Sequence, residues 1–122
     1  MSRRTRRAAA VVVACLALAP AATAGGNFPG LPGNWSHAEI NVTIAGQPHT
    51  LIYDRGRVKS ASPTELVVRE IDGSVVTVAV TPTTIVEVDG VRRRMRAVQR
   101  GYLAIARRVD GGSADHIWVS SR

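Results

Sequence analysis

Apolar and polar residues alternate along much of this chain, which is the pattern of β-strands with one buried face. In the first such run, Ile40, Val42 and Ile44 share one face. A two-residue turn at Gly46-Gln47 would place Val42 opposite Leu51, so that the apolar faces of the two strands match. We therefore predict a β-hairpin at the start of the folded region.

The second strand of this hairpin is expected to be long. It runs from Thr50 to Ala61, and Gly56 lies in its middle. A glycine inside a strand can bend or bulge the backbone. We expect the strand to bend at Gly56 and to serve two sides of a barrel.

The next two apolar runs predict a second hairpin, whose register depends on the length of its loop. A two-residue loop would mix polar and apolar residues on both faces. A three-residue loop, Ile71-Asp72-Gly73 with the glycine left-handed, instead makes Val68 face Val76. We choose the longer loop because it also places Leu66 opposite Val78, on the same apolar face.

The remainder of the chain predicts three further strands and one connection rich in arginine. Met95 and Val98 are the sizeable apolar residues of that connection, and their spacing fits one helical turn or an irregular segment. In the strand that follows, Leu103 and Ile105 share one face. The three strands are expected at residues 84–88, 102–109 and 114–120.

Short strands separated by Gly-rich turns predict a small all-β barrel or sandwich. Their order along the chain includes Gly56-Arg57-Val58, Leu66-Val67-Val68, Asp72-Gly73, Val76-Thr77-Val78, Thr84-Ile85, Gly90, Val98, Gly101 and Leu103-Ala104-Ile105. Over about residues 53–119, this order resembles a family of exported bacterial domains of unknown function with an OB-like fold. The resemblance implies a small OB-like barrel of about five to seven antiparallel strands, to which the hairpin at 38–53 is an N-terminal addition. It leaves the chemistry open, because the family has no assigned activity.

The first 24 residues have the three parts of a secretory signal peptide, namely a cationic start, an apolar run and a small-residue cleavage site. The apolar run at 8–19 is shorter than the roughly 20 residues that span a bilayer. We expect cleavage after Ala24, a flexible Gly- and Pro-rich tether over 25–36, and a single small β-barrel domain over 37–122. The residues that carry the signal are Arg3, Arg4, Arg6, Arg7 and Ala22-Thr23-Ala24.

A leader of this kind predicts a secreted, periplasmic or cell-envelope protein. The sole cysteine, Cys15, lies inside the leader, so the domain left after cleavage has no disulfide and relies on its apolar core. Two alternatives stay open. Val12-Val13-Ala14-Cys15 resembles a lipobox, and lipidation at Cys15 would anchor the protein to a membrane. Ser2-Arg3-Arg4 resembles a twin-arginine signal.

Charge is unevenly distributed once the leader is set aside. The chain has 16 Lys and Arg against 9 Asp and Glu, and the stretch between Val91 and Val109 contains arginines without any acidic residue. The planar guanidinium group suits phosphate, sulfate or carboxylate, so these arginines are candidate anion-binding residues. A solvated, Arg-biased surface loop is the competing interpretation. The candidates are Arg92, Arg93, Arg94, Arg96, Arg100, Arg107 and Arg108.

The sequence contains no recognisable motif for catalysis or for metal binding. No nucleophile motif surrounds a Ser or Thr, no Gly-rich loop leads into a helix, and the spacing of the carboxylates selects no pair. His37, His49 and His116 are scattered, so each is interpreted as an ordinary surface or strand-end residue. We therefore expect no enzyme, no metal site and no cofactor. Nucleic acid is not an expected partner, because stacking platforms need more aromatic residues than this chain offers.

Two kinds of function stay open. The first is a binding module for an anionic envelope component or extracellular ligand, recognised through the arginine stretch. The second is a structural or interaction protein that docks onto an envelope protein through a strand edge or the N-terminal tether. Salt should weaken binding of the first kind and leave the second largely unchanged.

Overall fold

The computed structural model describes residues 30–122, and within them the chain is all-β with one short 3₁₀ turn and no α-helix. The predicted signal peptide and most of the predicted tether lie outside the described residues. No helix in the described part is long and apolar enough to cross a membrane. The elements are β1 (His37–Ile44), β2 (Gln47–Ser62), β3 (Glu65–Glu70), β4 (Val75–Ala79), β5 (Ile85–Val88), β6 (Val91–Arg92), η3 (Met95–Ala97), β7 (Leu103–Val109) and β8 (Ala114–Ser120).

The eight strands form one mixed sheet in the order β4-β3-β2-β7-β8-β5-β6, with β1 paired to β2. The expected barrel of antiparallel strands is corrected on two points, because β5 pairs with β8 in parallel and the sheet stays open between β4 and β6. The reason lies in the tight turn at Asp89-Gly90. This turn folds β6 back onto β5, and β6 occupies the edge of β5 with which β4 would have to pair to close the sheet.

The hairpin of β3 and β4 has the predicted register. Leu66 faces Val78 and Val68 faces Val76, and the loop between the strands is the three residues that follow Glu70. Gly73 closes the loop with a φ of 91°, a left-handed conformation that glycine adopts without steric cost. The buried pattern of the two strands, rather than the Asp-Gly pair alone, sets this register.

The hairpin of β1 and β2 forms, but its predicted turn is wrong by one residue. The turn is Ala45-Gly46, with φ values of 51° and 79°, as a type I′ turn requires. At the other end of the hairpin, the amide of Arg55 donates to the carbonyl of Ser36 over 2.8 Å. This register places His37 opposite Asp54, and it keeps the predicted apolar residues on one face because the shift in pairing is two residues.

By contact, the described residues fall into two compact units. One contains residues 30–33 and the outer end of the first hairpin, Asn41–His49. The other contains Asn34–Ile40 and Thr50–Arg122, and it holds every site discussed below.

Besides its hairpin partner β1, strand β2 pairs with two other strands, as its length predicts. It pairs with β7 from Leu51 to Arg57 and with β3 from Gly56 to Ser62. Gly56 is the crossing point, where a Cβ atom would lie 2.3 Å from the main-chain oxygen of Arg69. The register shift itself comes later, between Val58 and Ser60. Glycine is thus needed at residue 56 for the close approach of two backbones rather than for a bulge.

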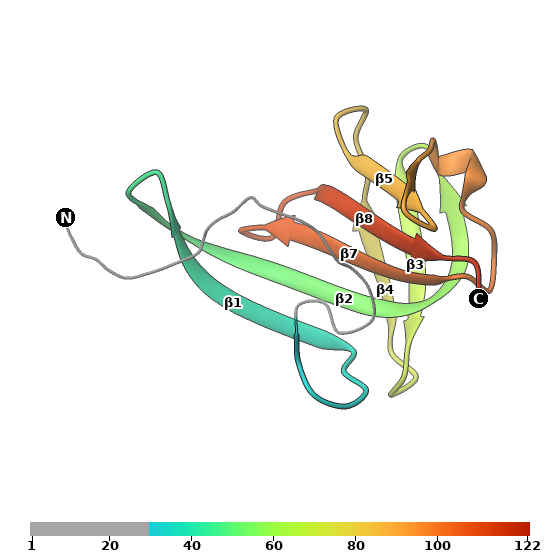
Figure 1. Cartoon of the computed structure of the whole chain (residues 1–122), viewed down its shortest axis with the longest axis horizontal. Helices are drawn as coiled ribbons and strands as arrows, with labels where there is room; N and C mark the ends of the chain where they lie inside the picture. Colours follow the sequence, from blue (N-terminus) through green and yellow to red (C-terminus); the bar gives the residue numbers. More distant parts are fainter. Residues whose placement is uncertain (1–29) are drawn as a thin grey trace. The chain divides into compact units, whose positions relative to one another are not determined.

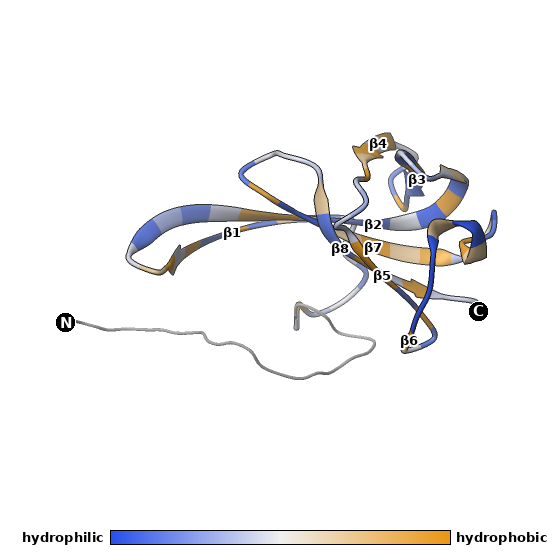
Figure 2. Ribbon diagram, turned by 90° about the horizontal axis from the view of Figure 1, so that it is seen from above, coloured by the Kyte–Doolittle hydropathy of each residue, from blue (hydrophilic) through white to orange (hydrophobic). Residues whose placement is uncertain are grey.

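The hydrophobic core lies between β3–β4 on one side and β7, β8 and β5 on the other, and the two groups of strands cross in Figure 1. Hydrophobic residues concentrate on these strands, whereas β1 and the adjoining part of β2 are largely hydrophilic (Figure 2). The 3₁₀ turn contributes the two apolar residues expected of it. The buried cluster consists of Val58, Leu66, Val68, Val78, Val80, Val86, Met95, Val98, Ala104, Ala106, Ala114, Ile117 and Val119.

Candidate functional site

The middle of β2 carries charges of opposite sign on its two faces. Side chains alternate along a strand, so Asp54 lies on the face that continues into the core, and Arg55 and Arg57 lie on the other face. Pairing adds neighbours to that outer face, because Arg57 is opposite Leu103 of β7 and opposite Arg69 of β3. Two polar sites therefore share one stretch of backbone.

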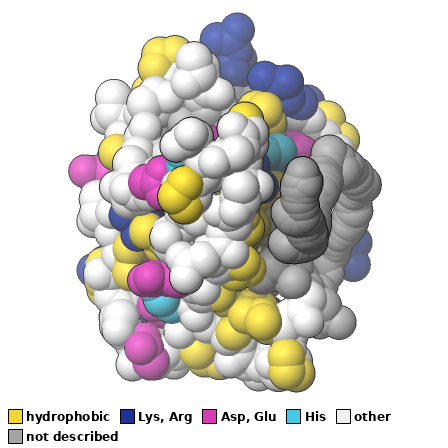
Figure 3. All heavy atoms as spheres, turned by 90° about the vertical axis from the view of Figure 1, so that its left-hand side faces the viewer, with side chains coloured by type: hydrophobic (Ala, Val, Ile, Leu, Met, Phe, Trp, Pro, Cys, Tyr) yellow, Lys and Arg dark blue, Asp and Glu magenta, His cyan; other side chains and the backbone are white. Residues whose placement is uncertain are grey.

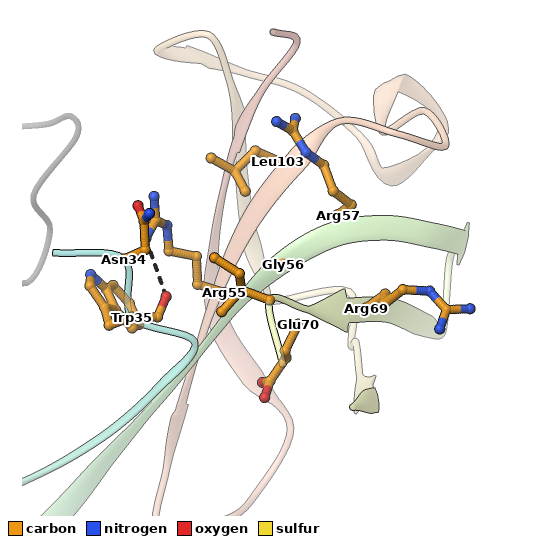
Figure 4. Close-up of a pocket in the computed structure, with 9 residues that line it drawn as sticks. Asn34, Trp35, Arg55, Gly56, Arg57, Arg69, Glu70 and Leu103 are labelled. Atoms are coloured by element: carbon orange, nitrogen blue, oxygen red, sulfur yellow. Dashed lines mark hydrogen bonds between the residues drawn. The ribbon is translucent and has the colours of Figure 1, made fainter. Parts of the chain in front are cut away.

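On the outer face, these side chains surround a hollow of about 300 Å³, which we call the arginine hollow. Figure 4 shows Trp35 and Arg55 on one side of it and Arg57 beside Leu103 on another. Glu70 is the acidic residue of the lining, and in Figure 4 its carboxyl group points away from Leu103 and Arg57. The full lining is Asn34, Trp35, Arg55, Gly56, Arg57, Arg69, Glu70, Ile71 and Leu103.

Arg55 and Trp35 are held against each other at the wall of the hollow. The guanidinium carbon of Arg55 lies 5.5 Å from the centre of the Trp35 ring, within cation–π range, and Arg55 Nη1 donates to the Trp35 carbonyl over 3.2 Å. The indole also meets Tyr53 edge to face, with 6.5 Å between ring centres. Trp35 Nε1 and Arg55 Nε are buried and have no hydrogen-bond acceptor in the described part of the chain. Both N–H groups are therefore enclosed by the protein rather than open to the hollow.

The two remaining arginines of the hollow are cross-strand neighbours of like charge. Arg57 and Arg69 are directly opposite in the β2–β3 ladder. Arg57 Nη1 donates to the main-chain oxygens of Gly101 (3.3 Å) and Arg122 (3.1 Å), which fixes its direction. Like charges directly opposite in a sheet are destabilising unless something neutralises them.

On the inner face lies a second site, the carboxylate cluster, formed by His37, Asp54, Glu70 and Arg108. Asp54 is 2% exposed and Glu70 is 7% exposed. His37 Nδ1 donates to Asp54 Oδ1 over 2.7 Å, and Arg108 Nη2 donates to Asp54 Oδ2 over 3.2 Å. Glu70 Oε2 is buried without a hydrogen-bond partner among residues 30–122. Histidine side chains beside acidic ones are visible on the face drawn in Figure 3.

The groups of the cluster shift one another's titration. Burial and then the hydrogen bond to Asp54 raise the pKa of Glu70 to about 7. Burial acts to raise the pKa of Asp54 as well, but its hydrogen bonds with Glu70 and His37 outweigh that effect and lower it. Hydrogen bonds to Asp54 and to Glu39 raise the pKa of His37. Below neutral pH, one proton is therefore shared between two carboxyl groups beside a cationic imidazole.

The structure separates the seven arginines predicted as anion-binding residues into two groups. Arg107 makes a bidentate ion pair with Asp115, at 3.0 and 2.9 Å, and lies over the ring of Trp118. Arg108 belongs to the carboxylate cluster. The other five are exposed, and the described residues offer none of them an ion-pair partner: they are Arg92, Arg93, Arg94, Arg96 and Arg100.

Neither site was predicted from the sequence. A signal for the hollow exists, because Arg55-Gly56-Arg57 places two cations with a spacing of two in a predicted strand. Arg69 joins them only through the β2–β3 register, and His37, Asp54 and Glu70 are too far apart in the sequence to form a recognisable motif.

Comparison with protein-family models, with curated proteins and with solved structures found no match to this chain. The resemblance to exported domains of unknown function therefore stays a prediction.

Proposed function

We propose that this chain is an exported, non-enzymatic binding module that holds an anionic ligand in the arginine hollow. The observation that carries the proposal is the set of three arginines, Arg55, Arg57 and Arg69, that line one concave site. Like charges in direct opposition cost free energy, and Arg57 and Arg69 are directly opposite in the β2–β3 ladder. An anion in the hollow offsets this repulsion.

The chemistry of the lining favours a ligand with a phosphate, sulfate or carboxylate group attached to an apolar or sugar-like body. Guanidinium groups bind such oxyanions through paired hydrogen bonds. Leu103 and the Trp35 ring supply apolar surface next to the cations. A hollow of about 300 Å³ accommodates one charged group with part of its carrier, which suits a monomer unit of an acidic glycan or a lipid head group.

The exposed arginines at 92–100 have a supporting role in this proposal. They have no ion-pair partner in the described part of the chain, so they add positive potential to the surface. A positive potential of this kind speeds the encounter with a polyanion and falls off steeply with salt. The hollow is then the site that positions the ligand, and the arginine stretch attracts it.

The test measures binding of the purified chain to a sulfated polysaccharide and to inorganic phosphate, with neutral dextran as the blank, at low and high salt. The double variant Arg55→Gln/Arg69→Gln removes two cations from the hollow. The matched variant Arg92→Gln/Arg93→Gln removes the same charge from the exposed stretch. We expect at least a tenfold loss of affinity in the first variant and about a twofold loss in the second. Equal losses in the two variants would contradict the hollow as the binding site.

Docking through a strand edge is the alternative, and β4 is an edge strand whose Val75 is 47% exposed. The hydrogen bond from the Glu70 amide to the Ser74 carbonyl sets an alternation in which the amide of Thr77 points away from β3. Thr77→Pro therefore blocks pairing at the outer edge and leaves the hairpin intact. Binding of an envelope protein that ignores salt and is lost in Thr77→Pro would support edge docking instead of anion binding.

A further inference from the structure

We propose that His37, Asp54 and Glu70 form a binding site for one divalent transition-metal cation of the Zn²⁺ type. The three residues come from β1, β2 and β3, and each offers one ligand atom such that all three atoms lie within 4.8 Å of one another. Ligand atoms bonded at about 2.0–2.2 Å to one cation in a tetrahedron lie about 3.3–3.6 Å apart. Binding therefore requires the widest pair of ligand atoms to approach by up to about 1.5 Å, which rotation of the side chains can supply.

Glu70 supplies the observation that points to a ligand rather than to a closed internal network. Its side chain is 7% exposed, and its Oε2 atom is buried without a hydrogen-bond partner in the described part of the chain. A buried carboxylate oxygen is costly when nothing donates to it. A cation placed among the three side chains gives this oxygen a bond.

Glu39 and Arg108 make hydrogen bonds to the ligand side chains of the kind that orient the ligands of a metal site. The Nδ1 atom of His37 faces Asp54, and its Nε2 atom donates to Glu39 over 2.9 Å. Metal-binding histidines commonly use one ring nitrogen for the cation and donate the other N–H to a carboxylate. Arg108 holds the second oxygen of Asp54, which leaves the oxygen nearer His37 for the cation.

The donor set decides the class of cation. One imidazole nitrogen with two carboxylate oxygens suits Zn²⁺ and its first-row neighbours better than Ca²⁺ or Mg²⁺, which prefer oxygen ligands alone. Two ionised carboxylates also balance the charge of a divalent cation. Three protein ligands leave at least one coordination position for water. The ring of His37 is 42% exposed, so the cation has a path to the site from solvent.

The experiment uses the purified chain without a polyhistidine tag, stripped with a chelator, and titrates it with Zn²⁺ by calorimetry. We expect one Zn²⁺ per chain and at least a tenfold loss of affinity in Glu70→Gln and in His37→Gln. Glu65→Gln on the same strand and His116→Gln, whose ring pairs with Glu87 at 2.8 Å, are matched controls that should bind like the wild type. Absence of saturable binding by the wild type, or unchanged binding by Glu70→Gln, would overturn the proposal.

A measurement on the unaltered chain keeps the proposal testable if a variant does not fold. Nitrogen NMR of the histidine rings reports directly on which imidazole binds the cation. Saturating Zn²⁺ should shift the His37 Nδ1 resonance and leave the His116 ring unchanged. A spectrum in which His37 does not respond contradicts the site. Neither experiment involves an anion, so its result is independent of the function proposed for the arginine hollow.

Discussion

The two faces of β2 near Gly56 differ in how their charged side chains are neutralised. On the inner face, Asp54 is buried and each of its oxygens accepts a hydrogen bond from a cationic side chain of the chain itself. On the outer face, Arg55 and Arg57 lie beside Arg69, and buried N–H donors have no acceptor in the described residues. The inner face nearly completes its own network, with one carboxylate oxygen left over, whereas the outer face leaves positive charge for a partner.

The two faces should therefore respond differently to substitution. Removing one member of a buried charge network leaves the others uncompensated, so inner-face substitutions should destabilise the fold. Removing one of several repelling cations should relieve strain, so outer-face substitutions should cost binding and little or no stability.

Asp54→Ala should have the largest effect. It leaves Arg108 and His37 without their shared carboxylate at a position that is 2% exposed, so we expect the free energy of unfolding to fall by about 3–5 kcal/mol. Asp115→Ala is the matched control, because it breaks a bidentate ion pair with Arg107 that is much more exposed, and it should cost about 0–1 kcal/mol. Urea unfolding of both variants measures the difference. Similar losses in both variants would show that the buried network stabilises the fold no more than an exposed ion pair does.

Gly56→Ala should come next, because it disturbs both faces together. The added Cβ would lie 2.3 Å from the main-chain oxygen of Arg69, and backbone cannot yield as a flexible side chain does. We expect a loss of about 3 kcal/mol, at the upper end for overpacking, together with weaker anion binding. Gly112→Ala serves as a control, since its nearest atom would be 3.4 Å away. A Gly56→Ala protein with wild-type stability would contradict the close crossing of β2 and β3.

The inner face should also make stability depend on pH. The pKa of Glu70 is raised from 4.5 to about 7, so the folded protein keeps a proton that the unfolded chain releases above pH 4.5. The stabilising contribution is complete below pH 4.5 and is lost as the pH rises through about 7. Glu70→Gln should remove this decline when unfolding is measured with a chelator present.

His116 provides an internal contrast for that measurement. Burial is the largest cause of its lowered pKa, so its contribution is lost as the pH falls below 6.5, the opposite direction. Because His116 is present in both proteins, the difference between wild type and Glu70→Gln removes its contribution and reports on the carboxylate cluster. Parallel stability curves for the two proteins between pH 4.5 and 7.5 would mean that Glu70 titrates normally.

Arg69→Gln should give the smallest change in stability and with the opposite sign. It removes the like charge opposite Arg57, so the free energy of unfolding should rise by about 0.2–1 kcal/mol while affinity for the sulfated polysaccharide falls. Arg96→Gln, in the exposed stretch, should change stability by less than about 0.5 kcal/mol. A destabilised Arg69→Gln protein would show that this arginine has a structural partner rather than a repelling neighbour.

Local patterns predicted the elements of this fold well where one face of a strand is buried. The alternation of Leu66, Val68, Val76 and Val78 set the β3–β4 register, because a slip of one residue would have exposed that whole face. The same reasoning was less informative for β7. Leu103 and Ile105 alternate as a core face would, yet Ala104 and Ala106 are the residues in the core cluster, and Leu103 lines the arginine hollow. The size of the side chains alone does not show which face of a strand packs against the main hydrophobic core when both faces carry apolar residues.

The sequence by itself determined the strands other than β6, most of the turns and the all-β class, because each depends on residues close together in the chain. It left the segment at Met95–Ala97 open between a helical turn and an irregular connection, and the structure has a 3₁₀ turn there. Only the tertiary structure decided that the sheet stays open, that His37 lies opposite Asp54 and that Arg57 lies opposite Arg69. Those outcomes follow from pairing between strands that are distant in sequence, and one shift of register between Val58 and Ser60 is enough to move every neighbour beyond it.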